Sequence, residues 1–260
     1  MPVYLLFIPG GLFLLVVFIR VGLPYLRTPA WRRPLKSAAY HRYRDEWEKS
    51  DEILEKALGR FPDRSEVYLE YYLNHSDSAD LKRRFEILKQ GWKRTGAVQL
   101  GFFLGSSYLE NGEYDKAKEI LDTPQCREYM KDRRIPMIPQ LYLEMGDWER
   151  AEEEFLDFHG IGIDTELEDL EAEELILLAL IRKAEGGDWA EIMRYAPKEG
   201  IHMAMTWKDY LAKLKNRYKD LKPAVTGIEG DPSRFNERRR EFFIKRIRLI
   251  EDYLSLKGTL

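Results

Sequence analysis

The chain has 260 residues, of which 44% are hydrophobic, so it can bury a substantial core. Charged residues make up 33%, but the formal net charge is -3, which argues against nucleic acid as a partner. The single cysteine, Cys126, cannot form an internal disulfide, and the four histidines are too scattered to form a zinc site. We therefore predict a packed or semi-exposed thiol at Cys126 and no bound metal.

The first 26 residues predict a transmembrane anchor. Residues 3–19 carry no charge and are rich in Leu, Phe, Val and Ile, and the apolar character continues past Arg20 to Leu26. A helix of this length would cross the hydrocarbon core of a bilayer, which is about 30 Å thick. A secretory signal peptide is the first alternative, but a basic start and a small-residue cleavage site are both missing. A buried core helix is the second alternative.

Charge predicts the orientation of this anchor. Basic residues follow the apolar span and none precedes it: Arg20, Arg27, Arg32, Arg33 and Lys36. Positive flanks stay on the cytoplasmic side, so we expect a single-pass protein of the cell membrane whose soluble part faces the cytoplasm. The basic flank, with Tyr25 and Trp31 beside it, would lie among anionic headgroups and hold the following residues near the membrane surface.

A pattern in the middle of the chain is written twice, 34 residues apart. The first copy consists of Leu104, Gly105, Tyr108, Gly112, Tyr114, Ala117 and Leu121. The second copy consists of Ile138, Pro139, Tyr142, Gly146, Trp148, Ala151 and Phe155. A fixed period of this size is typical of stacked helix-turn-helix units that bury their apolar faces against their neighbours.

The pattern extends in both directions and predicts about five repeats over residues 31–205. Trp47 and Leu81 fall in the slot of Tyr114 and Trp148, and the first repeat then places Ser50, Leu54 and Ala57 on an inner helix face. After Phe158 the period is lost, and the turn signature returns at Gly186-Gly187-Asp188-Trp189, 41 residues beyond Trp148. An insertion of seven residues explains the shift. The fifth repeat is a weak match, because Ile192 stands where a small residue is expected.

Residues 206–260 predict capping helices. Residues 206–221 form an amphipathic pattern, and residues 233–256 place apolar side chains at mostly helical steps with many arginines elsewhere. The end of a solenoid needs a capping helix with an apolar inner face and a polar outer face. The segment over residues 233–256 fits that description. The alternative is that its basic face binds lipid headgroups or an acidic partner.

These positions resemble the tetratricopeptide repeat family. The resemblance rests on Leu104-Gly105 with Tyr108, on Gly112-Glu113-Tyr114 with Ala117, and on Gly146-Asp147-Trp148 with Ala151 and Phe155. It implies an all-α fold, a TPR-like α-solenoid of helix hairpins. The predicted N-terminal transmembrane helix would precede this solenoid. Pro139 departs from the family pattern and predicts a helix that starts late or is kinked.

The small and large residues of the repeat have different expected roles. Gly105, Ala117 and Ala151 would let paired helices approach closely. The large side chains expected to fill the core beside them are Tyr108, Tyr142, Trp148 and Phe155.

No catalytic motif is present in the sequence. It contains no glycine-rich phosphate loop, no G-x-S-x-G and no H-E-x-x-H. His75 lies near Asp77 and Asp80 in the sequence. Such a combination in a turn is more often a group of solvent-exposed polar side chains than a metal site. We therefore expect no enzyme activity, no cofactor and no small-molecule substrate, and an enzyme with a dispersed site remains a remote third possibility.

The leading hypothesis for function is a membrane-tethered scaffold or adaptor that binds a protein or peptide on its solenoid surface. The family resemblance places the partner groove at Arg32, Glu66, Leu69, Leu73, Gln99, Phe102, Ser106, Arg133 and Gln140. These slots hold no asparagine of the kind that clamps a terminal carboxylate in chaperone-binding relatives, which argues against such a co-chaperone. The alternative is a structural subunit or assembly factor of a larger membrane-associated complex, for motility, secretion or the cell envelope.

Overall fold

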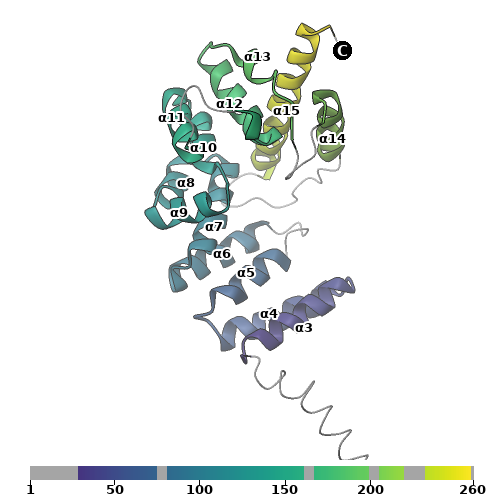
Figure 1. Cartoon of the computed structure of the whole chain (residues 1–260). Coiled ribbons are helices and arrows are strands. Elements are labelled where there is room, and N and C mark those ends of the chain that lie inside the picture. Colours follow the sequence, from purple (N-terminus) through teal and green to yellow (C-terminus); the bar gives the residue numbers. More distant parts are fainter. Residues whose placement is uncertain (1–28, 75–80, 161–166, 199–204, 220–231, 259–260) are drawn as a thin grey trace, which may run out of the picture. The chain divides into compact units, whose positions relative to one another are not determined.

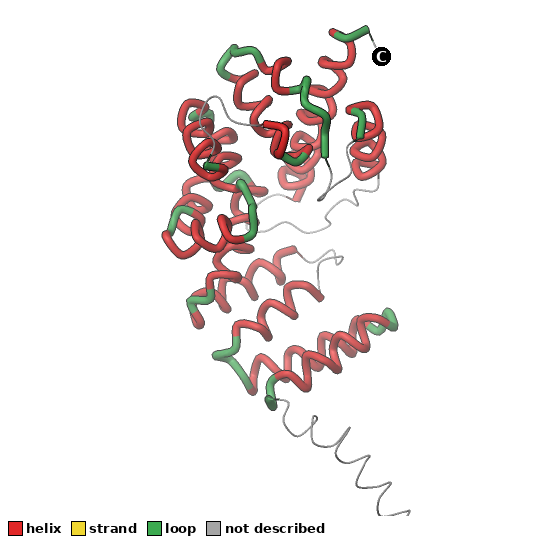
Figure 2. Tube along the Cα trace, in the orientation of Figure 1, coloured by secondary structure: helices red, strands yellow, loops and turns green. Residues whose placement is uncertain are grey.

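The computed structural model describes residues 29–74, 81–160, 167–198, 205–219 and 232–258 (Figures 1 and 2). Helices account for the regular structure of these residues, and no β-strand occurs among them, so the all-α prediction is confirmed for this part of the chain. The predicted anchor over residues 1–26 lies outside it. Within the described ranges, no helix combines the length and the apolar character that a bilayer crossing requires.

The chain divides into two units, residues 1–77 and residues 78–260. In the first unit, α3 (Arg32–Tyr43) and α4 (Trp47–Arg60) form a hairpin, and α5 (Ser65–Asn74) packs against both. The buried side chains that join these helices include Ala38, Ser50, Leu54, Ala57, Val67, Tyr68 and Tyr71. The predicted inner face of the first repeat is therefore confirmed.

A buried polar contact fixes these three helices in register. The hydroxyl oxygen of Ser50 lies 3.0 Å from the backbone oxygen of Ala38 and 2.8 Å from Oδ1 of Asn74. The amide nitrogen of Asn74 donates in turn to Asp51 Oδ1 at 2.5 Å. Because a buried polar group without a partner is costly, these contacts favour one alignment of α3, α4 and α5.

The second unit consists of further helices, and three of the hairpins among them carry the glycine turn of the repeat. The helices are α6 (Leu81–Thr95), α7 (Val98–Asn111), α8 (Tyr114–Leu121), α9 (Pro124–Asp132), α10 (Met137–Met145), α11 (Trp148–His159), α12 (Ala172–Ala184), α13 (Trp189–Ile192), α14 (Trp207–Lys219) and α15 (Pro232–Leu256). A short 3-10 helix spans Leu167–Asp169. The hairpins pair α7 with α8, α10 with α11, and α12 with α13.

Glycine ends the first helix of the two strongest repeats. Gly112 has a φ of 75° and Gly146 a φ of 81°, in the left-handed region that L side chains rarely adopt. The predicted turns at these two positions are thus confirmed. In the third hairpin the left-handed residue is Gly186, with a φ of 79°.

Helix α7 is approached closely on two sides. A Cβ on Gly101 would lie 2.6 Å from the Trp92 ring of α6, and a Cβ on Gly105 would lie 2.6 Å from Cγ of Leu121 in α8. Ala117 and Ala151, the other small residues of the pattern, are fully buried. The prediction that small residues permit close helix crossings is therefore confirmed at Gly105, and the burial of Ala117 and Ala151 is consistent with it.

The predicted aromatic filling is correct at three positions and wrong at one. Tyr108, Tyr142 and Phe155 are buried, but the side chain of Trp148 is 43% exposed. Trp148 is the first residue of α11, and this position lies at the edge of a hairpin rather than at the helix crossing. The equivalent Tyr114 is half-buried because the guanidinium of Arg238 from α15 lies 5.4 Å from its ring centre.

Two elements depart from a regular repeat. Helix α8 ends at Leu121, and α9 follows at once, with the Thr123 side chain accepting from the backbone N–H of Cys126 and Pro124 in its first turn. Helix α10 begins only at Met137, with Pro139 in the first turn, where a missing N–H costs little. The prediction of a late start for this helix is confirmed.

We predict that Gly105→Ala lowers the free energy of unfolding by about 1–3 kcal/mol, because the new methyl group would overlap the Leu121 side chain. Denaturant unfolding followed by circular dichroism would measure the loss. Leu121→Ala should cost stability alone but recover part of the loss in the double variant. Gly59→Ala in α4 is the matched control, since a Cβ there would meet no atom within 4 Å beyond its chain neighbours and the backbone of its own helix. Simple additivity of Gly105→Ala and Leu121→Ala would contradict the crossing.

Candidate functional site

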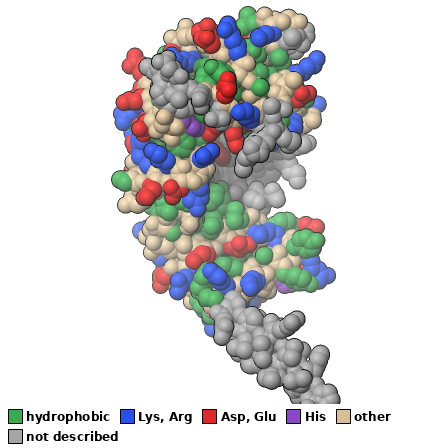
Figure 3. All heavy atoms as spheres, viewed as in Figure 1, with side chains coloured by type: hydrophobic (Ala, Val, Ile, Leu, Met, Phe, Trp, Pro, Cys, Tyr) green, Lys and Arg blue, Asp and Glu red, His purple; other side chains and the backbone are tan. Residues whose placement is uncertain are grey.

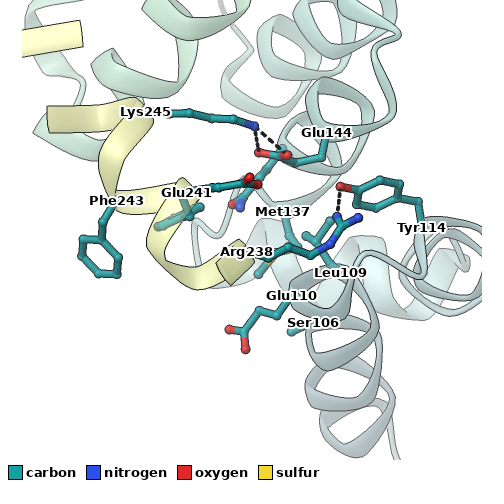
Figure 4. Close-up of a pocket in the computed structure, with 12 residues that line it drawn as sticks. Ser106, Leu109, Glu110, Tyr114, Met137, Glu144, Arg238, Glu241, Phe243 and Lys245 are labelled. Carbon is teal, nitrogen blue, oxygen red and sulfur yellow. Dashed lines mark hydrogen bonds and ion pairs between the residues drawn. The ribbon is translucent and has the colours of Figure 1, made fainter. Parts of the chain in front are cut away.

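A pocket of about 360 Å³ lies between α7, α8, α10 and α15 (Figure 4). Its first wall is formed by Ser106, Leu109 and Glu110 of α7, Tyr114 of α8, and Met137, Gln140 and Glu144 of α10. Its second wall is formed by Arg238, Glu241, Phe242, Phe243 and Lys245 of α15. The lining is more apolar than polar, as in sites that bind a side chain or a small apolar group.

The first wall follows from helical spacing. Ser106 and Glu110 are four residues apart on α7, as are Gln140 and Glu144 on α10, so each pair shares a helix face. Helices α7 and α10 are the first helices of consecutive hairpins. Repeat-protein binding surfaces are built from such positions.

Two polar contacts join α15 to this wall (Figure 4). Arg238 Nη1 donates to the Tyr114 hydroxyl at 2.5 Å, and Lys245 Nζ lies 3.0 Å from Glu144 Oε2. The Arg238 guanidinium also occupies the place where a Cβ on Gly112 would be. The side chain of Lys245 is half exposed, so its ion pair is worth at most about 1 kcal/mol.

A buried arginine fixes α15 against α12 and α14. Arg246 Nε lies 3.2 Å from Glu173 Oε2, and Tyr210 donates its hydroxyl hydrogen to Glu173 Oε1 at 2.5 Å. Burial lowers the pKa of the Arg246 guanidinium, and the Glu173 carboxylate opposes that change. Burial and the same carboxylate raise the pKa of Tyr210, so the phenol stays protonated and remains a donor.

The two halves of α15 are therefore held differently. Leu249, Ile250, Tyr253 and Leu254 of the second half are buried, whereas Arg240, Glu241 and Lys245 of the first half are exposed. The first half spans the pocket and is joined to the opposite wall by the polar contacts of Arg238 and Lys245.

The structure brings two of the predicted groove residues together, Ser106 and Gln140, which line the same pocket. Gln99 is half-buried on α7 and does not line this pocket. Phe102 is only 7% exposed, because Tyr129 of α9 covers it at 5.4 Å between ring centres. Arg133 follows α9, with its guanidinium 3.8 Å from the Tyr129 ring centre.

The other four predicted groove residues belong to the first unit. Arg32 is exposed on α3, and Glu66 is exposed on α5. Leu69 is half-buried and Leu73 is exposed, both on α5.

The sequence prediction missed most of the pocket. Glu110 and Glu144 lie one helical turn beyond Ser106 and Gln140, so helical spacing could have added them. Tyr114 belongs to the repeat pattern, which assigns it no role in binding. The α15 residues of the pocket lie about a hundred positions further along the chain than the residues of the first wall. No spacing in the sequence relates them to the repeat.

The described residues show no arrangement typical of metal or nucleophile chemistry. Within the described ranges, no three His, Cys, Asp or Glu side chains are grouped to hold a metal ion. Cys126 is a buried thiol, and burial raises its pKa, which disfavours the reactive thiolate. The His75, Asp77 and Asp80 combination lies outside the described residues.

His159 is the buried titratable group at the end of α11. Its ring contacts that of Phe155 in a tilted arrangement, 4.5 Å between ring centres, and its Nε2 lies 3.8 Å from Glu174 Oε1 of α12. Burial, together with nearby Arg134, lowers the pKa of His159 from 6.5 to about 4. The ring is therefore neutral at pH 7, and its contact with Glu174 is not an ion pair.

Comparison with known proteins gives a distant similarity. The chain is 28% identical over 162 residues to lipopolysaccharide assembly protein B of Escherichia coli K12, and equally to the proteins of that name from strains O6:H1 and O157:H7. The match covers 56% of this chain and 38% of each relative. The chain thus spans little more than a third of the length of these relatives. No protein-family model matches the sequence.

We predict that Lys245→Glu loosens the first half of α15, because two carboxylates would then face each other. Amide hydrogen exchange over residues 238–246 should accelerate about fivefold, as expected for a loss of about 1 kcal/mol. Glu144→Lys should also accelerate exchange. The double variant, Lys245→Glu with Glu144→Lys, should restore protection because opposite charges again face each other. Asp252→Lys is the matched control, because it breaks the Lys183–Asp252 pair at the other end of α15. Unchanged exchange in both single variants would contradict a role for this ion pair.

We predict that His159 makes the protein less stable in acid. Its folded pKa of about 4 lies below the ordinary value of 6.5, so between these pH values the unfolded chain binds more protons. The free energy of unfolding should therefore fall as the pH drops from 6.5 to 4, by up to about 3 kcal/mol. His159→Gln should flatten this dependence in denaturant titrations. Parallel pH curves for the two proteins would exclude His159 as the cause.

Proposed function

We propose that this protein is a membrane-tethered, TPR-like scaffold that binds a partner protein in assembly of the cell envelope. The described residues include three helix hairpins that turn at Gly112, Gly146 and Gly186, as the repeat pattern implies. The similarity to proteins named for lipopolysaccharide assembly supports an envelope role. We propose binding rather than catalysis as the activity, with a protein or peptide segment as the ligand.

The observation that carries the proposal is the pocket between α7, α10 and α15. One wall comes from first helices of consecutive hairpins, the usual binding side of a helical repeat. The opposite wall is a helix of the same chain, joined there by two polar contacts. A lining that combines apolar and charged residues suits an apolar side chain projecting from an amphipathic partner segment.

The membrane tether is the second part of the proposal. The uncharged run over residues 3–19 and the basic residues after it support a single-pass anchor with the helical part on the cytoplasmic side. A fixed anchor would raise the local concentration of the scaffold around other membrane components.

A second candidate function is a permanent structural subunit of a membrane-associated complex. The name of the similar proteins is compatible with either role. Extraction in mild detergent would separate them, because an adaptor would leave the membrane as a small species and a subunit would co-migrate with a large complex.

We predict that Gln140→Trp fills the pocket and abolishes partner binding, while the helix hairpins remain folded. Proteins that co-purify with the tagged full chain from its native membranes should be recovered at least about tenfold less, the loss expected at an interface hot spot. Glu119→Trp on the exposed side of α8 is the matched control. Equal recovery with both variants, at equal melting temperature, would remove the pocket as the binding site.

A further inference from the structure

Helix α3 carries an uncovered stripe of basic and aromatic side chains, Arg32, Lys36, Tyr40 and Tyr43, which we call the α3 stripe. These residues are spaced by four, four and three positions, so they share one side of the helix. The opposite side is packed, since Ala38 is fully buried against the rest of the unit. All four stripe residues are exposed.

Helix α3 differs in charge from its hairpin partner α4. Helix α3 contains the cations Arg32, Arg33, Lys36 and Arg42 and no aspartate or glutamate. Helix α4 mixes both signs, with the acids Glu48, Asp51, Glu52 and Glu55 and the cations Lys49, Lys56 and Arg60. Although the whole chain has a net charge of only -3, α3 presents a basic surface.

The aromatic residues of the stripe are unusually open to solvent. Tyr43 is 89% exposed and Tyr40 is 55% exposed, and Trp47, the first residue of α4, is 36% exposed. Tyr40 is not randomly oriented, because Arg44 Nη1 donates to its hydroxyl at 2.9 Å. Basic and hydrophobic side chains both gather at this end of the α3–α4 hairpin in Figure 3.

We propose that the α3 stripe lies flat on a bilayer surface that contains anionic lipids. Arg32 and Lys36 would bind headgroup phosphates, while Tyr40 and Tyr43 would insert their rings at the level of the headgroups with their hydroxyls towards water. A 12-residue helix is about 18 Å long, so the whole stripe could contact one leaflet at once. This contact would fix the orientation of the first hairpin on the membrane.

The position of α3 in the chain favours lipid over an acidic protein. Only twelve residues separate Ile19, the end of the uncharged run, from Arg32, the start of α3. If that run is the anchor proposed above, α3 begins close to the headgroups of the same membrane. The inference rests on the proposed anchor for this proximity alone, and not on the pocket or its partner.

The test uses the full chain in vesicles and a fluorophore attached at Tyr43→Cys. Cys126 is buried, and the labelled wild-type chain measures any background at that position. A quencher carried on lipid headgroups reports contact with the surface. Lys56→Cys on α4 is the matched control, since Lys56 is exposed and outside the stripe.

We expect severalfold stronger quenching at position 43 in vesicles of phosphatidylcholine with phosphatidylglycerol than in phosphatidylcholine alone. High salt should remove the difference, as should the pair Arg32→Glu and Lys36→Glu, because both weaken attraction to anionic lipid. The label at position 56 should respond to neither change.

Equal quenching at positions 43 and 56, or quenching at position 43 that ignores lipid charge, would overturn the proposal. So would a label at position 43 that is shielded only after native membrane proteins are added, which would identify a protein as the occupant. A carbonate wash tests the anchor separately. If the wash removes the chain but salt-sensitive quenching at position 43 in anionic vesicles persists, the anchor is wrong and the α3 stripe still binds lipid.

Discussion

The second unit depends on how closely α7 can be approached by its neighbours. Gly101 makes room for the Trp92 ring, and one turn later Gly105 makes room for Leu121. Because interiors are close-packed, a single methyl group at either place must displace a large side chain. Ser106 directly follows Gly105, so the contact that fixes α7 against α8 also fixes the direction in which the pocket wall faces.

The pocket itself depends on a contact far away in the sequence. Glu173 accepts from both Arg246 and Tyr210, and this cluster joins three helices that share no repeat pattern. If one partner of such a cluster is removed, the remaining polar groups lack a hydrogen-bond partner. The cluster therefore specifies where α15 lies more than it adds net stability. With the second half of α15 held in this way, the first half reaches α7 and α10, where Arg238 and Lys245 make polar contacts with the pocket wall.

The sequence could predict the hairpins because they are local. The 34-residue period marks Gly112 and Gly146, and only glycine readily adopts the backbone that these turns require. The site could not be predicted in the same way. Phe102 does not face an open groove, because α9 covers it. The sequence does contain a start signal for α9, Thr123 followed by Pro124, but this signal does not say which residues the helix will cover. The placement of α15 depends on a tertiary contact that leaves no periodic trace.

The two surfaces proposed for binding differ in their electrostatics. At the pocket, Lys245 already faces Glu144, so this pair of charges is compensated, and we expect recognition to depend mainly on shape and apolar burial. On α3, Arg32 and Lys36 have no acidic residue on their own helix, so attraction to a charged surface should weaken as salt is added. Raising the ionic strength should therefore weaken the contact of α3 with lipid and have less effect on partner binding in the pocket. A scaffold built this way could release its first hairpin from the headgroups without losing a partner held in the pocket.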